Sequence, residues 1–285
     1  MRSLGVDVSE RRGLDLVLLE ESAQLAQARS RVGLEELRAL LSEWKPDIVA
    51  IDSPPGRGVR GGARQAERDL LRLGIHSYGT PSRADQLSRP AYGWMRVGFE
   101  VFAECERLGY ARYSGGSVLA PCAAEVFPHA SAVVLSGGLP PRGVTKEAFR
   151  RAILAECGVA LGPLGSLDLV DAALAALTGL HALRGDFSTV GDAEDGFLLL
   201  PTATRPTTPF KRCAPHPRQD EPQRHLPRLA ACACGDPECR ATTDREFAPG
   251  HDAKRKSLLW SQARAGQEAI EELRRRGWAI PPDLS

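Results

Sequence analysis

The segment 167–183 constrains the fold of this chain more than any other, because it is apolar or small on almost every side. Its leucines and valines recur at helical spacing, with Ser166 in front as a predicted N-cap. A helix that is apolar all round is one that a folded chain buries. We therefore expect a long buried helix near the end of the first domain.

One acidic residue, Asp171, lies inside this predicted helix. A buried carboxylate is costly unless it is paired or bound to a metal, so Asp171 is the most informative candidate functional residue. The helix is interrupted by Thr178 and His181, and its most apolar window is shorter than the roughly 18 residues that cross a bilayer. The sequence therefore predicts no membrane insertion.

The region before this helix alternates between predicted strands and helices. In order, we expect a hairpin over 4–8 and 14–19, a weak third strand near 23–29, a helix over 34–44, a buried strand over 47–52, a helix over 63–73, a loop over 75–92, a helix over 94–108, a strand ending at Pro128, a helix from about Thr145, and the buried helix. This order predicts an α/β domain over residues 1–201.

The composition changes after Pro201, where prolines alternate with Arg, His and Thr. We interpret residues 202–231 as a linker and residues 232–285 as a small module with a C-terminal helix. Three of the seven cysteines fall within eight residues of this module, which favours metal binding in a reducing cytoplasm over a disulfide framework. No uninterrupted apolar segment near the N-terminus resembles a signal peptide, so we expect a cytoplasmic protein.

The module resembles short Cys-rich modules that are appended to some bacterial proteins. Cys232, Cys234, Cys239 and His251 would form a closed tetrahedral Zn²⁺ site. The Cys-x-Cys spacing is tighter than that of the common Cys-x2-Cys knuckle, so free thiols and redox-sensing cysteines are the alternatives. Cys213 with His216 is a competing ligand pair.

The charges of the chain nearly balance, with 37 Lys and Arg against 36 Asp and Glu. No overall field therefore recruits nucleic acid or an anionic membrane, and any polyanion must be bound locally. The four Trp and four Tyr are scattered, and they indicate no base-stacking platform.

Acidic residues end two predicted strands and begin the buried helix. Asp7 and Asp52 lie at the strand ends, while Asp168 and Asp171 share one helical face. Carboxylates from two strands and one helix suit a two-metal site, in which Mg²⁺ or Mn²⁺ activates water and stabilises the leaving oxygen. The alternatives are that Asp7 and Asp52 serve turns and that Asp168 interacts with the helix dipole.

This order of elements resembles the RNase H-like fold, a mixed sheet flanked by helices. The segment 168–172 is similar to the late Asp-x-x-Asp-Ala helix of Holliday-junction resolvases. The closer resemblance, over about residues 1–201, is to the family of predicted RNase H-like nucleases called domain of unknown function 429. It is carried by Gly5-Val6-Asp7, Ile51-Asp52-Ser53-Pro54-Pro55-Gly56, Arg64-Gln65-Ala66-Glu67-Arg68, Glu125-Val126-Phe127-Pro128, the segment 168–173, and Gly191-Asp192 with Glu194 and Gly196.

The resemblance implies that Asp7, Asp52 and Asp171 are the metal ligands, with Asp168 as a fourth candidate. It also implies a role for Glu125, which lies in a motif resembling the family's Glu-x-aromatic-Pro; a solvent-facing strand glutamate is the alternative.

Other charged residues near these motifs have competing interpretations. We expect Glu67 to pair with Arg64 or Arg68 on an exposed helix face. Arg57, Arg60 and Arg64 either position phosphates or form a solvated basic face.

The leading functional hypothesis is a metal-dependent nuclease, or a hydrolase of another phosphodiester. One alternative is an actin-like ATP-dependent phosphotransferase, for which Ser136-Gly137-Gly138-Leu139 is the candidate phosphate loop. The other is a non-catalytic nucleic-acid or protein-binding adaptor, in which the acids are structural and the zinc module makes the interaction.

Overall fold

The computed structural model describes residues 1–59, 61–213, 230–231, 242–243, 259 and 267–276. The chain consists of two units, Met1–His216 and Pro217–Ser285. Among the described residues, no helix is long and apolar enough to cross a membrane.

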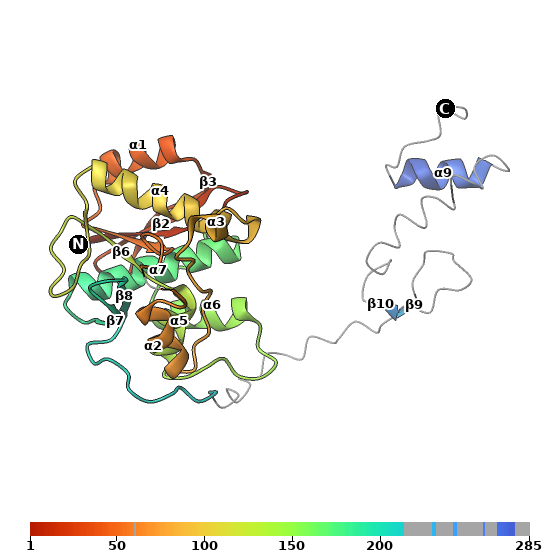
Figure 1. Cartoon of the computed structure of the whole chain (residues 1–285). Helices are drawn as coiled ribbons and strands as arrows, with labels where there is room; N and C mark the ends of the chain where they lie inside the picture. The colour runs from red at the N-terminus through yellow and green to blue at the C-terminus, as the bar shows by residue number, and fades with distance from the viewer. Residues whose placement is uncertain (60, 214–229, 232–241, 244–258, 260–266, 277–285) are drawn as a thin grey trace. The chain divides into compact units, whose positions relative to one another are not determined.

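An eight-stranded mixed sheet forms the centre of the N-terminal unit (Figure 1). Its strand order is β3-β2-β1-β4-β6-β8-β7, and β5 also pairs with β6. The strands β1, β2 and β3 form an antiparallel meander, whereas β4, β6 and β8 continue parallel to β1. The strands are β1 Arg2–Asp7, β2 Leu14–Glu20, β3 Leu25–Val32, β4 Ile48–Asp52, β5 Ala111–Arg112, β6 Cys122–Glu125, β7 Ser188–Asp192 and β8 Gly196–Leu200.

This meander followed by parallel strands is the topology of the RNase H-like fold, so the predicted fold class is confirmed. Because β1, β4 and β6 are parallel, they all end at the same edge of the sheet. In open α/β sheets, ligands bind at such an edge, beyond the carboxyl ends of the parallel strands.

Helices cover both faces of the sheet (Figure 1). The helices α1 and α4 pack on one face, where Leu37 and Phe102 join the apolar side chains of β1 and β2. On the other face, α7 packs directly on the sheet, with α2, α5 and α6 beside it. The helices are α1 Leu34–Trp44, α2 Gln65–Arg72, α3 Ala84–Leu87, the 3-10 helix η1 Pro90–Tyr92, α4 Gly93–Arg107, α5 Pro128–Ser136, α6 Lys146–Glu156 and α7 Leu167–Leu183.

The predicted buried helix is α7, and small residues let it approach the sheet closely. A methyl group on Gly5 of β1 would stand 1.9 Å from the carbonyl oxygen of Ala172, and one on Gly179 would meet Ser3 Oγ at 2.2 Å. The Ser166 hydroxyl accepts the Leu169 N–H at 3.1 Å, which confirms the predicted N-cap. The start of α7 is thereby fixed over the end of β1.

Several predicted elements differ from the structure. The strand expected to end at Pro128 ends at Glu125, and Pro128 is the first residue of α5, because proline is well suited to a position whose N–H has no helical partner. The segment 75–92 contains α3 and η1 rather than loop alone. The helix α5 and the hairpin β7–β8 were not predicted.

The first part of the predicted linker lies within the N-terminal unit and packs against it. Phe210 donates its N–H to the carbonyl of Leu73, and Arg205 pairs with Asp69 at 2.7 Å. The boundaries 1–201, 202–231 and 232–285 stay predictions.

In the C-terminal unit, the described residues form a short antiparallel pair, β9 Ala230–Ala231 with β10 Thr242–Thr243, and the helix α9 Gln267–Arg275. Cys232, Cys234, Cys239 and His251 lie outside the described residues, so zinc binding stays a prediction.

Candidate metal centre

Three aspartates lie side by side across the central strands. Asp7 at the end of β1 is in register with Asp15 of β2 on one side and with Asp52 of β4 on the other. Residues in register on neighbouring strands point to the same face of a sheet. That face is the one covered by α7, because Gly5, two residues before Asp7, contacts this helix.

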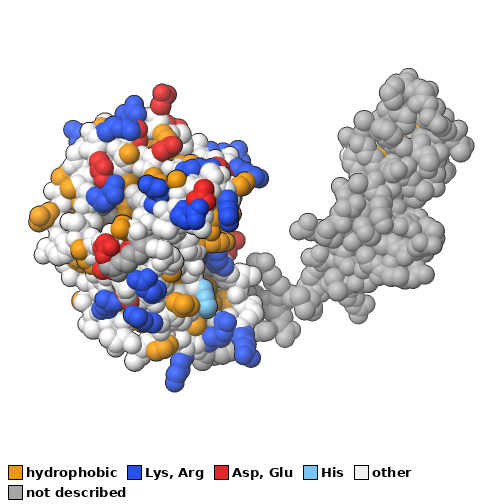
Figure 2. Space-filling model, in the orientation of Figure 1, with side chains coloured by type: hydrophobic (Ala, Val, Ile, Leu, Met, Phe, Trp, Pro, Cys, Tyr) orange, Lys and Arg blue, Asp and Glu red, His pale blue; other side chains and the backbone are white. Residues whose placement is uncertain are grey.

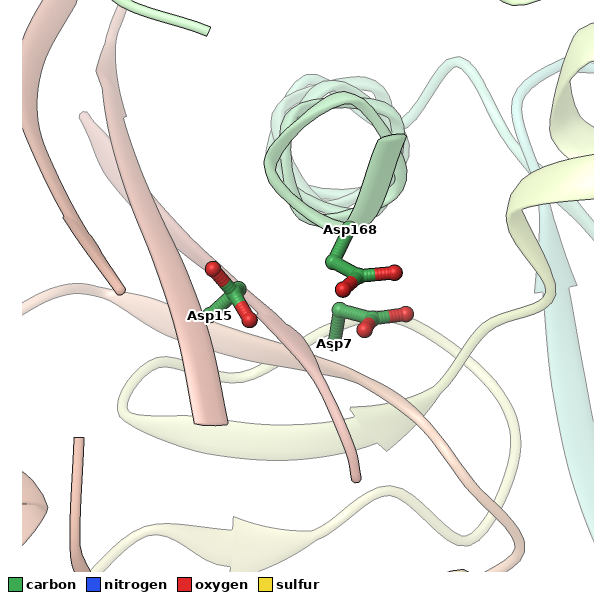
Figure 3. Close-up of side chains that lie close together, drawn as sticks. All are labelled: Asp7, Asp15 and Asp168. Carbon is green, nitrogen blue, oxygen red and sulfur yellow. The ribbon is translucent and has the colours of Figure 1, made fainter. Parts of the chain in front are cut away.

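The first turns of α7 add two more carboxylates. Asp168 and Asp171 are three residues apart and project from one side of the helix. Single carboxylate oxygens of Asp7, Asp15 and Asp168 lie within 4.8 Å of one another, and Figure 3 shows these side chains converging from β1, β2 and α7. A group of this kind could hold a metal ion through hard oxygen ligands.

The carboxyl groups of the cluster lie close together and largely away from water, so ionising all of them is unfavourable. Burial, and then repulsion from Asp171 and Asp168, raises the pKa of Asp7 to about 8. Burial, followed by repulsion from Asp7 and Asp171, raises the pKa of Asp52 well above its usual range. Burial also raises the pKa of Asp171, although Arg150 opposes the shift. A divalent cation would relieve this repulsion and favour the ionised carboxylates.

Two arginines supply part of the missing positive charge. Arg12, in the β1–β2 turn, pairs with Asp168 at 2.6 Å, and its side chain is largely exposed. Arg150 of α6 is buried and donates from Nη1 to Asp171 Oδ1. Asp171 is half-buried, with a side chain that is 13% exposed, and its carboxylate is paired with Arg150. It also lies close to the other acidic residues, which act on it by repulsion.

Glu125 is not solvent-facing, since it is only 5% exposed. Arg64 donates to both of its carboxylate oxygens, at 2.8 Å from Nη1 and 2.5 Å from Nη2. Glu125 is in register with Ile51 rather than with Asp52, but it lines one cavity together with Asp52 and Asp171. Its predicted catalytic role stays a prediction.

Glu67 pairs with Arg64 at 3.1 Å, as predicted, but the expectation of an exposed helix face is wrong for both residues. Glu67 is 7% exposed and Arg64 is 3% exposed. Glu67 also accepts the N–H of Thr80 at 2.8 Å. Because Arg64 is fully engaged in this buried pairing with Glu67 and Glu125, it neither joins a solvated basic face nor remains free for a phosphate.

A cavity of about 210 Å³ opens beside the aspartates. Asp52 and Asp171 line it together with the cationic side chains of Lys146 and Arg150. The buried ion-paired residues Arg64, Glu67 and Glu125 also line the cavity. Apolar and aromatic groups form much of the remaining wall, namely Val8, Leu70, Tyr78, Trp94, Met95, Val126, Phe127 and Leu198.

Asp15 is the member of this cluster that was not predicted. The signal was available in the hairpin, because a turn centred near residue 11 pairs Asp7 with Asp15. In the folded protein Asp15 is only 4% exposed.

The candidate phosphate loop of the phosphotransferase hypothesis is a helix ending. Ser136 is the last residue of α5, and Gly137 adopts the left-handed conformation typical of a helix C-cap. A helix C-terminus presents carbonyl oxygens and a partial negative charge, which disfavours phosphate. The geometry therefore removes the sequence support for that hypothesis.

The strand order and the converging carboxylates define an RNase H-like α/β domain with an acidic site at the ends of its parallel strands. A family model described as a protein of unknown function (DUF429) matches residues 5–195, and the chain belongs to this family. No curated protein matches the chain. A solved structure of Thermus thermophilus RuvC is similar, with 17% sequence identity, coverage of 65% of this chain and 97% of that chain, and a TM-score of 0.37.

Proposed function

We propose that this protein is a metal-dependent phosphodiester hydrolase, most simply a nuclease that acts by two-metal-ion catalysis. The observation that supports it best is the position of Asp7. This residue lies between two pairs of carboxylates, Asp15 with Asp168 on one side and Asp52 with Asp171 on the other. A shared carboxylate between two ligand sets is what a two-metal site requires.

The donor chemistry fits Mg²⁺ or Mn²⁺, because every candidate ligand is a carboxylate oxygen. Asp7, Asp52 and Asp171 are the primary proposed ligands, with Asp15 and Asp168 completing the set. When bound, such ions activate water and stabilise the leaving oxygen of a phosphodiester. Structural aspartates in an adaptor would not require five such acids in one partly buried cluster, where their mutual repulsion is unfavourable.

Other residues of the chain would orient the site and attract the substrate. Arg150 holds one oxygen of Asp171, so that carboxylate is fixed in direction. Lys146 is exposed at the cavity, where its charge favours an anionic substrate. Val126 and Leu198 exclude water from the cavity wall, which strengthens electrostatic interactions inside it.

The test is cleavage of labelled single-stranded, double-stranded, hybrid and branched DNA and RNA in Mg²⁺ or Mn²⁺. The wild type is compared with Asp7→Asn, Asp171→Asn and the control Asp47→Asn. Asp47 precedes β4 at the opposite edge of the sheet, where it accepts the Arg2 N–H at 2.7 Å, and asparagine can accept the same bond.

We expect metal-dependent cleavage that Asp7→Asn and Asp171→Asn abolish and Asp47→Asn retains. An active Asp171→Asn variant would contradict the ligand assignment. Metal binding without cleavage of any polymer would indicate a smaller phosphodiester as substrate. An absence of metal binding would favour the adaptor.

A further inference from the structure

Two aromatic side chains stand at the mouth of the cavity that contains Asp52 and Asp171. Tyr78 lies in the loop between α2 and α3, and Trp94 lies at the start of α4. Their ring centroids are 6.2 Å apart with an interplanar angle of 66°. Tyr78 is 76% exposed, so most of its ring is accessible to a ligand. The scattered aromatic residues of the sequence therefore do form one candidate stacking pair.

The same two rings border a second hollow on their other side. This outer hollow has a volume of about 660 Å³ and is lined by Ser9, Arg11, Arg12 and Pro90 as well as by both rings. Tyr78 and Trp94 thus separate the carboxylate-bearing cavity from a wider surface groove beside the β1–β2 turn. A linear ligand could extend from the inner cavity to the outer hollow across the aromatic pair.

Cationic groups lie on both sides of the rings. Lys146 and Arg150 line the inner cavity, which also contains the carboxylates of Asp52, Asp171, Glu67 and Glu125. Arg11 and Arg12 line the outer hollow beside Glu10, and Arg12 also pairs with Asp168. Arg150 is 2% exposed, and among the described residues its Nε has no hydrogen-bond partner. Its guanidinium also donates to Asp171, so it places a fixed positive charge at the wall of the inner cavity, where it would attract a phosphate.

We propose that this surface binds single-stranded nucleic acid, with one unpaired base in the inner cavity and a neighbouring base stacked at Tyr78 and Trp94. The inference rests on the proposed function, because the inner cavity holds two of the proposed metal ligands. The alternation of cation, aromatic pair and cation matches a strand in which phosphates alternate with bases. In a duplex the bases stack on one another, so these rings could not reach their faces without extrusion of a nucleotide.

The surface charge agrees with recognition by stacking. On the described part of the face drawn in Figure 2, basic and acidic side chains are interspersed rather than gathered into one basic track. The near-neutral net charge likewise gives little long-range attraction for a phosphate backbone. Specific contacts with unpaired bases would therefore carry much of the affinity.

The experiment measures binding separately from cleavage. Fluorescence anisotropy with the full-length Asp7→Asn protein, which we expect not to hydrolyse the probe, compares labelled dT12, rU12 and a 12-base-pair duplex. Trp94→Ala and Tyr78→Ala are added in the same background. Tyr113→Ala is the matched control, because Tyr113 packs against Phe187 and Phe197 and lines neither hollow. Thermal unfolding verifies that each variant is folded.

We expect a single strand to bind at least about tenfold more tightly than the duplex. Loss of one stacking ring should weaken single-strand binding by about 5-fold to 150-fold, since a stacked base contributes about 1–3 kcal/mol. Tyr113→Ala should change it less than about twofold. Equal binding of duplex and single strand, unchanged binding by Trp94→Ala and Tyr78→Ala, or no binding of any probe would overturn the inference.

The two proposals fail in different ways. Metal-dependent cleavage that acts on duplexes alone would leave the hydrolase in place and overturn the single-strand inference. Ring-dependent binding of dT12 without cleavage of any substrate would overturn the proposed hydrolase and retain the stacking surface. The comparison of dT12 with rU12 distinguishes DNA from RNA as the source of the unpaired base.

Discussion

Gly5 of β1 lies so close to Ala172 of α7 that a single added methyl group would stand 1.9 Å from the Ala172 carbonyl oxygen. The contact is with backbone atoms, so no side-chain rearrangement can relieve it. This closeness sets the height of α7 above the sheet. Two residues further along β1, Asp7 faces the first turns of the same helix, so the packing contact and the acidic cluster depend on one another.

We predict that Gly5→Ala destabilises the protein and also weakens metal binding. The added methyl group must push α7 away from β1, which overpacks the core by about 1–3 kcal/mol and separates Asp168 from Asp7. Urea unfolding and Mn²⁺ titration measure the two effects. Gly165→Ala is the control, because a methyl group there would enter open space. Unchanged metal affinity in a destabilised Gly5→Ala variant would show that helix height does not set the site.

We predict that Arg64→Met costs about 3–5 kcal/mol of unfolding free energy. The substitution leaves Glu67 and Glu125 buried without their shared cation. The control Arg83→Met breaks an ion pair with Asp85 in which both side chains are more than half exposed, and it should cost less than about 1 kcal/mol. The unfolding free energies of the two variants are compared by chemical unfolding at neutral pH. Similar losses in the two variants would mean that Arg64 is dispensable for the stability of this buried network.

We predict that His129 makes the stability of the protein depend on acidity. Burial, and then the charges of Arg150 and Lys146, lowers the pKa of His129 to about 4 from an ordinary value of 6.5. The unfolded chain therefore takes up this proton first, and stability present above pH 6.5 is lost as the pH falls towards 4.

The measurement is the difference in unfolding free energy between wild type and His129→Gln at pH 7.5 and pH 4.5. At pH 7.5 His129 is neutral in both the folded and the unfolded protein, so the difference measured there reflects only the packing lost on substitution. We expect the difference to shift by about 1–2 kcal/mol in favour of the variant at pH 4.5. An unchanged difference would show that His129 does not remain neutral in the folded protein.

We predict that Asp7 contributes stability to the metal-free protein that is lost as the pH rises from about 4 to about 8. The folded protein retains the proton of Asp7, whose pKa is about 8, while the unfolded chain has already released it near 3.8. Stability contributed by this group therefore falls across that range. Asp7→Asn should be more stable than wild type at pH 8 without metal, by roughly 1–3 kcal/mol. Lower stability of the variant would contradict the unfavourable charge that we assign to Asp7.

The sequence predicted the parts of the site that local pattern determines. Asp171 interrupts a helix whose other residues are apolar or small, so it stood out on its own. Asp7 and Asp52 end apolar strands, where turn roles were the alternative. Their convergence followed from the family resemblance and the order of elements. The meander and the buried helix were also predicted from local pattern, because both have clear periodicity.

The missed features depend on distant partners. Arg64 and Glu125 are 61 residues apart, and only the three-dimensional structure reveals that they neutralise one another. Tyr78 and Trp94 come together through the loop before α3, for which no sequence pattern was available. Asp15 required the register of the hairpin as well as its existence. Burial and pairing between distant segments thus determine which charged residues are neutralised by a partner and which remain available to bind a ligand.

The most direct test of the central claim is calorimetric titration of Mn²⁺ into the full-length protein. We expect saturable binding by wild type, loss of that binding in Asp7→Asn, and at least about tenfold weaker binding in Asp15→Asn, because both carboxylates belong to the same cluster. Asp47→Asn should bind as wild type does. Failure of the wild type to bind, or wild-type affinity in Asp7→Asn, would contradict a metal centre built around Asp7.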